Sequence, residues 1–147
     1  LIVSAEVSQV RFYLESARNQ LDFLVSKIEQ EEVAPGMNEE FIALMTGALA
    51  ATDQIISMQY IDAEDQLIGV TRDEDSTSLQ LESMRGDDDL KELIEAVRRD
   101  RASRWGGLLW REAHRQATLT YLAPALRDDQ VIGVASVLIS VRTPSRK

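Results

Sequence analysis

The stretch that decides the fold is residues 3–28, which read VSAEVSQVRFYLESARNQLDFLVSKI. Apolar side chains recur in it at alternating intervals of four and three residues, and the positions with this spacing are Val3, Val7, Val10, Leu14, Ala17, Leu21, Leu24 and Ile28. The spacing is typical of one apolar face of a long α-helix, and the stretch contains neither glycine nor proline. It predicts a single helix over residues 1–31, about 45 Å long at a rise of 1.5 Å per residue.

A helix of this length exceeds what a domain of 147 residues needs for its own core. Its apolar face therefore has two uses that the sequence leaves open. The face packs on a sheet of the same chain, or part of it pairs with a second copy in a homodimer. The two uses are compatible, because they can apply to different parts of the helix.

The remaining segments alternate between helical and strand-like periods. Pro35-Gly36 ends the first unit, and Asn38 is a suitable N-cap for a second helix over residues 38–52. The period then changes to two, with an exposed loop expected over residues 73–88 and a short helix starting at Asp87-Asp88-Asp89; the predicted strands are 54–62, 67–72, 105–112, 117–126 and 131–141. The order predicts an α+β fold in one domain over residues 1–147, in which the long N-terminal helix and the second helix pack on a five-stranded antiparallel sheet that occupies residues 54–141.

Composition restricts the possible partners and the possible chemistry. The net charge is −9, which disfavours binding to a nucleic acid. No cysteine is present, so disulfides and thiolate metal sites are excluded. No apolar run approaches the roughly 20 residues of a membrane span. Because the chain begins with Leu1-Ile2-Val3, we expect it to be a processed or excised piece, with any membrane anchor outside it.

Catalytic constellations are scarce in the sequence. His114 is the only histidine, and it falls in a predicted hairpin turn. A glycine-rich phosphate loop, a nucleophile elbow and an HExxH motif are all absent from the sequence. The acidic clusters Asp73-Glu74-Asp75 and Asp87-Asp88-Asp89 lack the spacing of a calcium loop, and we interpret them as solvated charges. We therefore expect no enzyme activity, no metal and no cofactor.

The few aromatic residues are more informative. Tyr60, Trp110 and Tyr121 can share one concave sheet face with Met58 and Ala123, given the period of two in their strands. An aromatic floor with a few polar groups is what a small-ligand pocket requires. The alternative is that these side chains fill the core between the sheet and the helices.

Two stretches carry a resemblance to a known family. Residues 55–68 read IISMQYIDAEDQLI, and YLAPAL at 121–126 is followed by VIGVA at 131–135. With the order of elements, they resemble the Cache (PDC) sensor domains, the PAS-like extracytoplasmic domains of bacterial histidine kinases, chemoreceptors and nucleotide cyclases. The resemblance implies a ligand cavity on one sheet face, formed with the segment before the third predicted strand. It also implies that the N-terminal helix emerges from a membrane span.

Members of this family that bind amino acids carry an Arg-x-Trp-Tyr pattern ahead of the third strand, a later tyrosine and a still later aspartate. Arg101, Arg104 and Trp105 lie in that region and Tyr121 follows. The sequence departs from the pattern at two points, because Gly106 stands where the pattern has its first tyrosine and the last predicted strand contains no acidic residue. A carboxylate or another small metabolite is therefore as good a candidate ligand as an amino acid. The resemblance and the aromatic positions together predict a ligand site formed by Met58, Tyr60, Arg104, Trp105, Trp110, Tyr121 and Ala123.

The resulting functional hypothesis is an extracytoplasmic ligand-sensing domain of a transmembrane signalling receptor. It would lie on the periplasmic side of the bacterial inner membrane, bind a small molecule on the sheet and relay the change through the N-terminal helix. Anchoring would come from segments outside this sequence. The alternative is a cytosolic PAS- or GAF-type module that uses the long helix for dimerisation.

Overall fold

The structure is a computed structural model that describes residues 2–72, 77–83, 88–111 and 116–141. Its helices are α1 (Ile2–Glu29), α2 (Glu39–Ala51) and α3 (Asp88–Asp100). Helices α1 and α2 occupy the two segments expected to be helical before the sheet. The expected cap is present, because Asn38 Oδ1 accepts a hydrogen bond from the Phe41 backbone nitrogen at 2.8 Å. Within the described residues, no helix has both the length and the hydropathy that a membrane crossing requires.

The strands form one antiparallel sheet in the order β3-β2-β1-β7-β6-β4, with β5 also paired to β6. Their bounds are β1 (Ile55–Asp62), β2 (Gln66–Arg72), β3 (Thr77–Ser83), β4 (Arg104–Trp105), β5 (Leu109–Arg111), β6 (Gln116–Arg127) and β7 (Gln130–Ser140). Five long strands make the body of the sheet, and the two short strands β4 and β5 continue it beyond β6. The predicted α+β fold, with two helices on a PAS-like antiparallel sheet, is confirmed.

Two predictions about the strands are wrong in detail. The expected loop over residues 73–88 contains β3, which pairs with β2 from Arg72↔Thr77 to Gln66↔Ser83. Residues 77–83 read TSLQLES, in which polar and apolar residues alternate as they do in a strand. Leu79 and Leu81 are its only apolar residues, so its composition resembles that of a polar loop. The expected strand over residues 105–112 is two short strands, because the chain leaves the sheet at Gly106-Gly107 and returns at Leu109.

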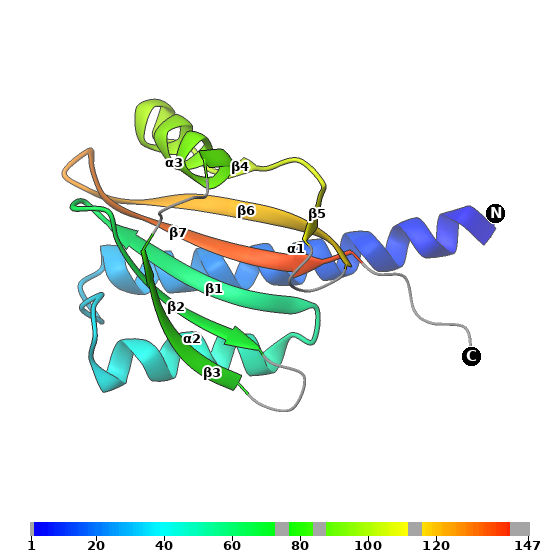
Figure 1. Ribbon diagram of the computed structural model, residues 1–147, viewed down its shortest axis with the longest axis horizontal. Helices are drawn as coiled ribbons and strands as arrows, with labels where there is room; N and C mark the ends of the chain where they lie inside the picture. Colours follow the sequence, from blue (N-terminus) through cyan, green and yellow to red (C-terminus); the bar gives the residue numbers. More distant parts are fainter. Residues whose placement is uncertain (1, 73–76, 84–87, 112–115, 142–147) are drawn as a thin grey trace.

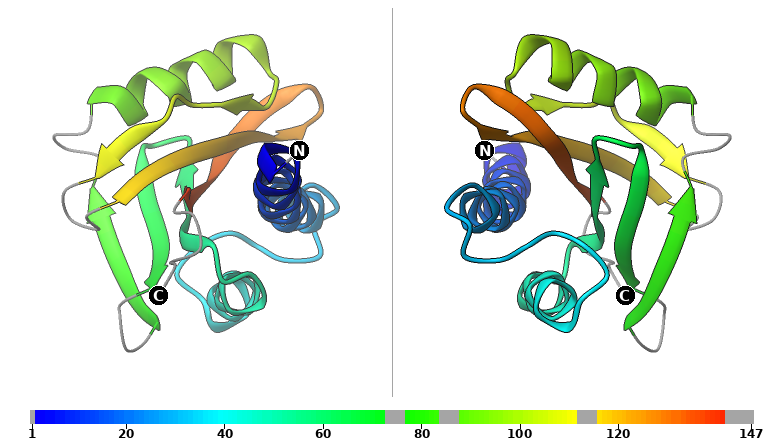
Figure 2. Two further views of the ribbon diagram at one scale, coloured as in Figure 1. Left: turned by 90° about the vertical axis from the view of Figure 1, so that its right-hand side faces the viewer. Right: turned by 90° about the vertical axis from the view of Figure 1, so that its left-hand side faces the viewer.

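The helices cover opposite faces of the sheet (Figure 1, Figure 2). Helix α1 packs over β6 and β7, and α2 packs over β1 and β2 on the same face. This face holds the larger core cluster, to which both helices contribute. Helix α3 packs over β6 and β7 on the other face, where a smaller cluster is formed by Ile61, Leu67, Leu90, Ile94, Val97, Leu122 and Val134.

The apolar seam of α1 is divided between the core and the outside. Its C-terminal part is fully buried against the sheet, with Ala17, Leu21, Leu24 and Ile28 at most 1% exposed. Leu14 is half-buried at the border of this cluster. Nearer the N-terminus, α1 extends past the end of the sheet (Figure 1). Sheet packing therefore accounts for the seam from Leu14 to Ile28, and pairing with a second copy stays a prediction.

The C-terminal end of α1 is fastened to the β6–β7 hairpin. Arg127 Nη2 donates to the carbonyl oxygen of Ile28 at 2.9 Å, and the Leu126 backbone nitrogen donates to Glu29 Oε2 at 2.8 Å. A cation at a helix C-terminus is favoured by the helix dipole and by the carbonyls that lack intrahelical donors. This end of α1 is thus held in place, while its N-terminal part extends away from the sheet.

Candidate functional site

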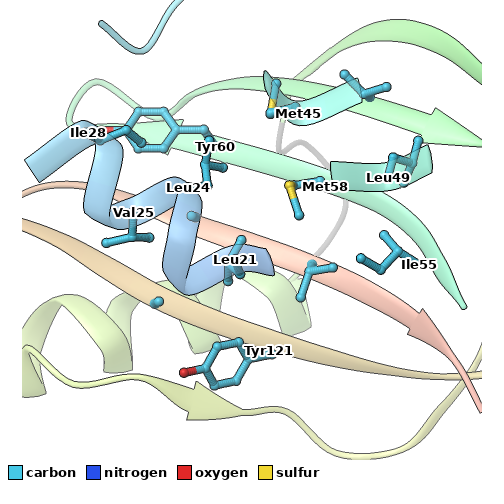
Figure 3. Packing of buried hydrophobic residues seen from close by; sticks show 14 of the residues in the cluster. Leu21, Leu24, Val25, Ile28, Met45, Leu49, Ile55, Met58, Tyr60 and Tyr121 are labelled. Carbon is cyan, nitrogen blue, oxygen red and sulfur yellow. The ribbon is translucent and has the colours of Figure 1, made fainter. Parts of the chain in front are cut away.

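Four of the predicted ligand residues lie in the core beneath α1 and α2. Met58, Tyr60, Tyr121 and Ala123 are all at most 5% exposed. They pack with apolar side chains of both helices, among them Leu21, Leu24, Ile28, Met45 and Leu49 (Figure 3). The structure thus assigns them the core-filling role that the sequence left as the alternative, and a ligand-binding role for them stays a prediction.

The other three predicted residues lie on β4 and β5. Trp105 is partly exposed in β4 and packs against Tyr121, with ring centroids 4.7 Å apart. Arg104 precedes it, is exposed, and is the register partner of Leu122, so it belongs to the α3 side of the sheet. Trp110 is the register partner of Ala117, and its side chain lies outside the described part of the structure. The structure therefore brings Trp105 and Tyr121 together and places Arg104 on the other side of the sheet.

Tyr121 connects the edge of the sheet to α1. Its hydroxyl donates to Asp22 Oδ1 at 3.2 Å. Burial raises the pKa of Tyr121, a hydrogen bond with Ser103 opposes the shift, and the Asp22 carboxylate adds to it. The hydroxyl is therefore a neutral donor at physiological pH. The hydroxyl therefore links α1 to strand β6. The preceding residue of β6, Thr120, faces the α3 side of the sheet, because successive residues of a strand face opposite sides.

Tyr60 is held by the β6–β7 hairpin. Its ring meets Phe41 edge-on at 5.7 Å, and its hydroxyl donates to the carbonyl oxygen of Ile132 at 3.4 Å. Burial raises the pKa of Tyr60 to about 12; the Asp62 carboxylate adds to this and Arg127 opposes it. Both tyrosines thus carry polar tips with protein partners, which is how buried tyrosines are usually accommodated.

The α3 side of the sheet has a different chemistry. Four buried side chains on this side carry a hydroxyl group, and each is at most 6% exposed: Ser57, Thr118, Thr120 and Ser136. They share this side with Ile61, Leu122 and Val134 of the smaller cluster, because they alternate with the buried residues of the α1 side. We call these four residues together with Gln59 the polar patch. It spans β1, β7 and β6 beside the region where α3 packs.

Gln59 and Ser136 form the centre of the polar patch. They are register partners, and Ser136 Oγ donates to Gln59 Oε1 at 3.4 Å. Gly69, the register partner of Gln59 on β2, leaves room for the glutamine side chain, because a Cβ there would lie 2.9 Å from Gln59 Cγ. A polar side chain thus crosses the face of a buried sheet, where each hydroxyl or amide group costs free energy unless it has a partner.

Two contacts place the segment after α3 beside this patch. The Gly106 backbone nitrogen donates to the Thr120 carbonyl oxygen at 2.7 Å. A Cβ at Gly106 would lie 2.9 Å from Leu93 Cδ1 of α3, so glycine allows the helix to approach the strand closely. The position at which the amino-acid-binding pattern has tyrosine is therefore filled by a side chain of α3.

Sequence reasoning missed the polar patch. The signal that identifies it is the recurrence of serine, threonine and glutamine at alternate positions of strands that are otherwise buried, as in Ser57 and Gln59. Within the described ranges, no group of three or more acidic or histidine side chains is arranged to hold a metal ion. His114 and the acidic residues 73–75 fall outside the described residues, as does Asp87.

Comparison with known proteins identifies the fold. Neither a family model nor a curated protein matches the chain. Among solved structures, it is similar to the ligand-binding domain of the Pseudomonas aeruginosa amino acid chemoreceptor PctC in complex with GABA, with a TM-score of 0.65, 12% identity, and coverage of 96% of this chain and 59% of that one. It is also similar to the periplasmic sensory domain of the Campylobacter jejuni chemoreceptor Tlp1, with a TM-score of 0.72, 8% identity, and coverage of 93% and 57%.

A third similar structure comes from another class of receptor. It is the extracellular domain of soHK1S-Z6, which is assigned as a histidine kinase, with a TM-score of 0.70, 15% identity, and coverage of 92% of this chain and 56% of that one. The chain spans little more than half the length of these structures. The resemblance to Cache domains is thereby confirmed at the level of fold: the chain has the PAS-like fold of the extracytoplasmic sensory domains of chemoreceptors and histidine kinases.

Proposed function

We propose that this chain is an extracytoplasmic ligand-sensing domain of a transmembrane signalling receptor, and that it has no enzymatic role. The observation that carries the proposal is the buried polar patch on the α3 side of a sheet whose other side is filled by apolar side chains. The fold supports it, because the similar structures are sensory domains and the PctC domain is described in complex with GABA. Location outside the cytoplasm and anchoring through segments beyond this sequence are parts of the same proposal.

The proposed ligand site is the polar patch together with Arg104. Serine and threonine hydroxyls both donate and accept hydrogen bonds, and a glutamine amide offers two donors and one acceptor oxygen. Such groups can fix the orientation of a small polar molecule on an otherwise apolar surface. Arg104 is on the same side of the sheet and is exposed, so it is available to a carboxylate at the border of the site.

The predicted residues on the opposite side then have a supporting role. Met58, Tyr60 and Tyr121 fix the strands from below through their packing with α1 and α2. Ala123 belongs to the same core cluster as the buried residues of α1. Ligand binding changes the balance between two arrangements of α1 only by its difference in affinity for them.

The test is a ligand screen followed by paired variants. Thermal unfolding of the chain is measured with amino acids, GABA, small carboxylates and uncharged polyols, and the affinity of any stabilising compound is measured by calorimetry. Ser136→Ala and Thr120→Val, which remove single hydroxyls from the patch, should each weaken binding at least tenfold. Thr46→Val on α2 is the matched control, because α2 covers the other side of the sheet.

Two results would count against the proposal. One is a screen in which no compound of these classes raises the unfolding midpoint. The other is binding that Ser136→Ala and Thr120→Val leave unchanged, since the ligand would then lie away from the polar patch. Location is tested separately by fusing alkaline phosphatase, which is active only outside the cytoplasm, after Lys147 in the complete protein.

A further inference from the structure

Strand β4 is too short to hold its own position at the edge of the sheet. It has two residues, and its register with β6 consists of the pairs Arg104↔Leu122 and Trp105↔Tyr121. A strand pair this short is marginal in water unless another element packs against it. The position of β4 therefore depends on the elements that contact it from outside the strand pair.

Helix α3 is the element that adjoins both ends of β4. A Cβ at Gly106, the residue after β4, would lie 2.9 Å from Leu93 Cδ1, so the helix and the end of the strand are in close contact. Before β4, the chain leaves α3 at Arg101, which has a φ of 53° and whose backbone nitrogen donates to the Val97 carbonyl oxygen at 2.8 Å. Such a left-handed residue ends a helix and turns the chain sharply. A shift of α3 is thus transmitted to β4 from both sides.

The last turn of α3 is fastened to the turn between β1 and β2 by Arg98. Its Nη2 donates to the Asp62 carbonyl oxygen at 3.0 Å and lies 2.9 Å from Asp65 Oδ1. We call this pair of contacts the clamp. The turn that receives it is ordered by its own bonds, because Asp62 Oδ1 accepts from the backbone nitrogens of Glu64 and Gln66, each at 2.9 Å. Charge-assisted hydrogen bonds are directional, whereas the apolar packing of the smaller cluster is not, so the clamp fixes where this end of α3 lies.

We propose that Arg98 is a positioning residue, which through α3 holds β4 against β6 and thereby sets Arg104 and Trp105. These two residues of β4 face opposite sides of the sheet, because successive residues of a strand alternate. A displacement of β4 therefore moves both together: the arginine of the proposed ligand site, and the indole whose ring centroid lies 4.7 Å from that of Tyr121. The consequence for a ligand rests on the proposed function, whereas the clamp itself does not.

The neighbouring Arg99 supplies a comparison within the same helical turn. Its side chain is 70% exposed and lies 3.3 Å from Asp100, whereas the side chain of Arg98 is 28% exposed. An exposed ion pair between adjacent residues contributes little, and this one joins two residues of α3 to each other. The two arginines carry the same charge and differ in whether they attach α3 to the sheet, so Arg99→Met is the matched control for Arg98→Met.

Quenching of Trp105 fluorescence by acrylamide tests the clamp. The chain has two tryptophans, so a Trp110→Phe background leaves Trp105 as the only one. Acrylamide is uncharged, and the change of charge in a variant therefore does not alter its access. Arg98→Met should raise the quenching constant about twofold, because an indole that is 37% exposed is released from its contact with Tyr121, and Arg99→Met should leave the constant unchanged.

A second variant changes the other partner of the clamp. Asp65 has a φ of 64°, which asparagine also tolerates, so Asp65→Asn removes the charge without straining the turn. It should raise the quenching constant less than Arg98→Met does, because the bond to the Asp62 carbonyl oxygen remains. Glu64→Gln makes the same change of charge at an exposed position of the same turn and should have no effect.

A destabilised variant separates the clamp from general loss of stability. Met45→Ala removes a buried side chain from the core on the other side of the sheet, so it should lower the free energy of unfolding and leave the quenching constant unchanged. A constant that Arg98→Met does not raise would overturn the proposal, as would an equal rise in Met45→Ala. None of these measurements uses a ligand, so a failed ligand screen and a failed test of the clamp are distinguishable.

Discussion

Replacing Gly133 by alanine would place a methyl group in the volume that the Tyr60 side chain occupies. A Cβ at this position would lie 2.0 Å from Tyr60 Oη, 2.2 Å from Cζ and 2.9 Å from Cε1. Gly133 lies in β7 and is the register partner of Asp62, so Tyr60 reaches diagonally across to it. The backbone of Gly133 does not have a positive φ, and the expected penalty is therefore one of packing alone.

The size of the penalty follows from how Tyr60 is confined. Its ring cannot withdraw toward α2, because Phe41 meets it edge-on at 5.7 Å, and it is only 2% exposed. An extra methyl group in a filled core usually costs about 1–3 kcal/mol, and an overlap with the hydroxyl oxygen and two ring carbons of Tyr60 places this case near the upper end. For a chain of this size a loss of about 3 kcal/mol corresponds to a fall of roughly 10 °C in Tm.

Urea unfolding followed by circular dichroism measures this loss. Gly107→Ala is the matched control, because a Cβ there would meet nothing within 4 Å, and its free energy of unfolding should stay within about 0.5 kcal/mol of the parent. In a Tyr60→Leu background the cost of Gly133→Ala should fall below about 1 kcal/mol, since the clashing atoms are gone. A Gly133→Ala variant as stable as the parent, or an equal cost in both backgrounds, would refute this packing.

Three further predictions concern the buried phenol of Tyr60 and helix α2. Because the pKa of Tyr60 is about 12 in the folded chain and about 10 when exposed, its neutral form stabilises the fold fully below pH 10 and this contribution is lost as the pH rises toward 12. Between those values the free energy of unfolding of the parent should fall relative to Tyr60→Phe, by at most about 1.4 kcal/mol per pH unit in urea titrations; parallel curves would contradict it. Arg72→Met should lower the free energy of unfolding by about 1.5–3 kcal/mol, because Arg72 Nη2 donates to the carbonyl oxygens of Leu49 and Thr52 at the end of α2. The control is Arg99→Met at an exposed position, which should change the free energy of unfolding by less than about 0.5 kcal/mol. A change as small as this for Arg72→Met would show that the contact is unimportant. Gly47→Ala should stabilise α2 by about 0.5–1 kcal/mol, because a Cβ at this exposed helical position meets nothing within 4 Å, and a loss of stability would show that it is not free.

The parts of the fold that could be predicted are those with strong local patterns. Helix α1 follows from an unbroken seam without glycine or proline. The β6–β7 hairpin follows from two strands around Asp128-Asp129, which both have positive φ, a conformation that aspartate tolerates better than most residues. Strand β3 could not be predicted in the same way, because a polar strand at the edge of a sheet is specified by its partner β2 and its own composition resembles a loop.

The face of the sheet that binds the proposed ligand could not be predicted, because the sequence of a single strand does not contain that information. A period of two divides a strand into two faces, but it does not indicate which face meets which helix. In β7 both faces are largely apolar, so Ser136 is a small exception in a buried strand. The prediction selected the aromatic residues because an aromatic floor with a few polar groups is what a small-ligand pocket requires. The structure shows that Met58 and Tyr60 meet α1 and α2, whereas the serine and threonine residues lie on the α3 side.

The two sides of the sheet meet in adjacent residues of β6, and this gives a route from the proposed ligand site to α1. Thr120 belongs to the polar patch, and the next residue, Tyr121, donates its hydroxyl to Asp22 of α1. We therefore expect a ligand that shifts β6 to act directly on the hydrogen bond between Tyr121 and Asp22 of α1. Thr120→Val and Tyr121→Phe each remove one oxygen from neighbouring positions, and they should separate binding from transmission.

Tyr121→Phe should leave ligand affinity within about twofold and lower the protection of α1 amides against hydrogen exchange about fivefold, the equivalent of one hydrogen bond of about 1 kcal/mol. Thr120→Val should do the reverse, weakening the ligand at least tenfold and leaving exchange in α1 unchanged without ligand. Hydrogen exchange over residues 17–28 measures both variants. If the two substitutions affect binding and exchange alike, β6 is only a scaffold and the change reaches α1 by another path. If Tyr121→Phe alters hydrogen exchange in α1 without altering ligand affinity, its hydroxyl is the contact that joins the sensing side of the sheet to the helix.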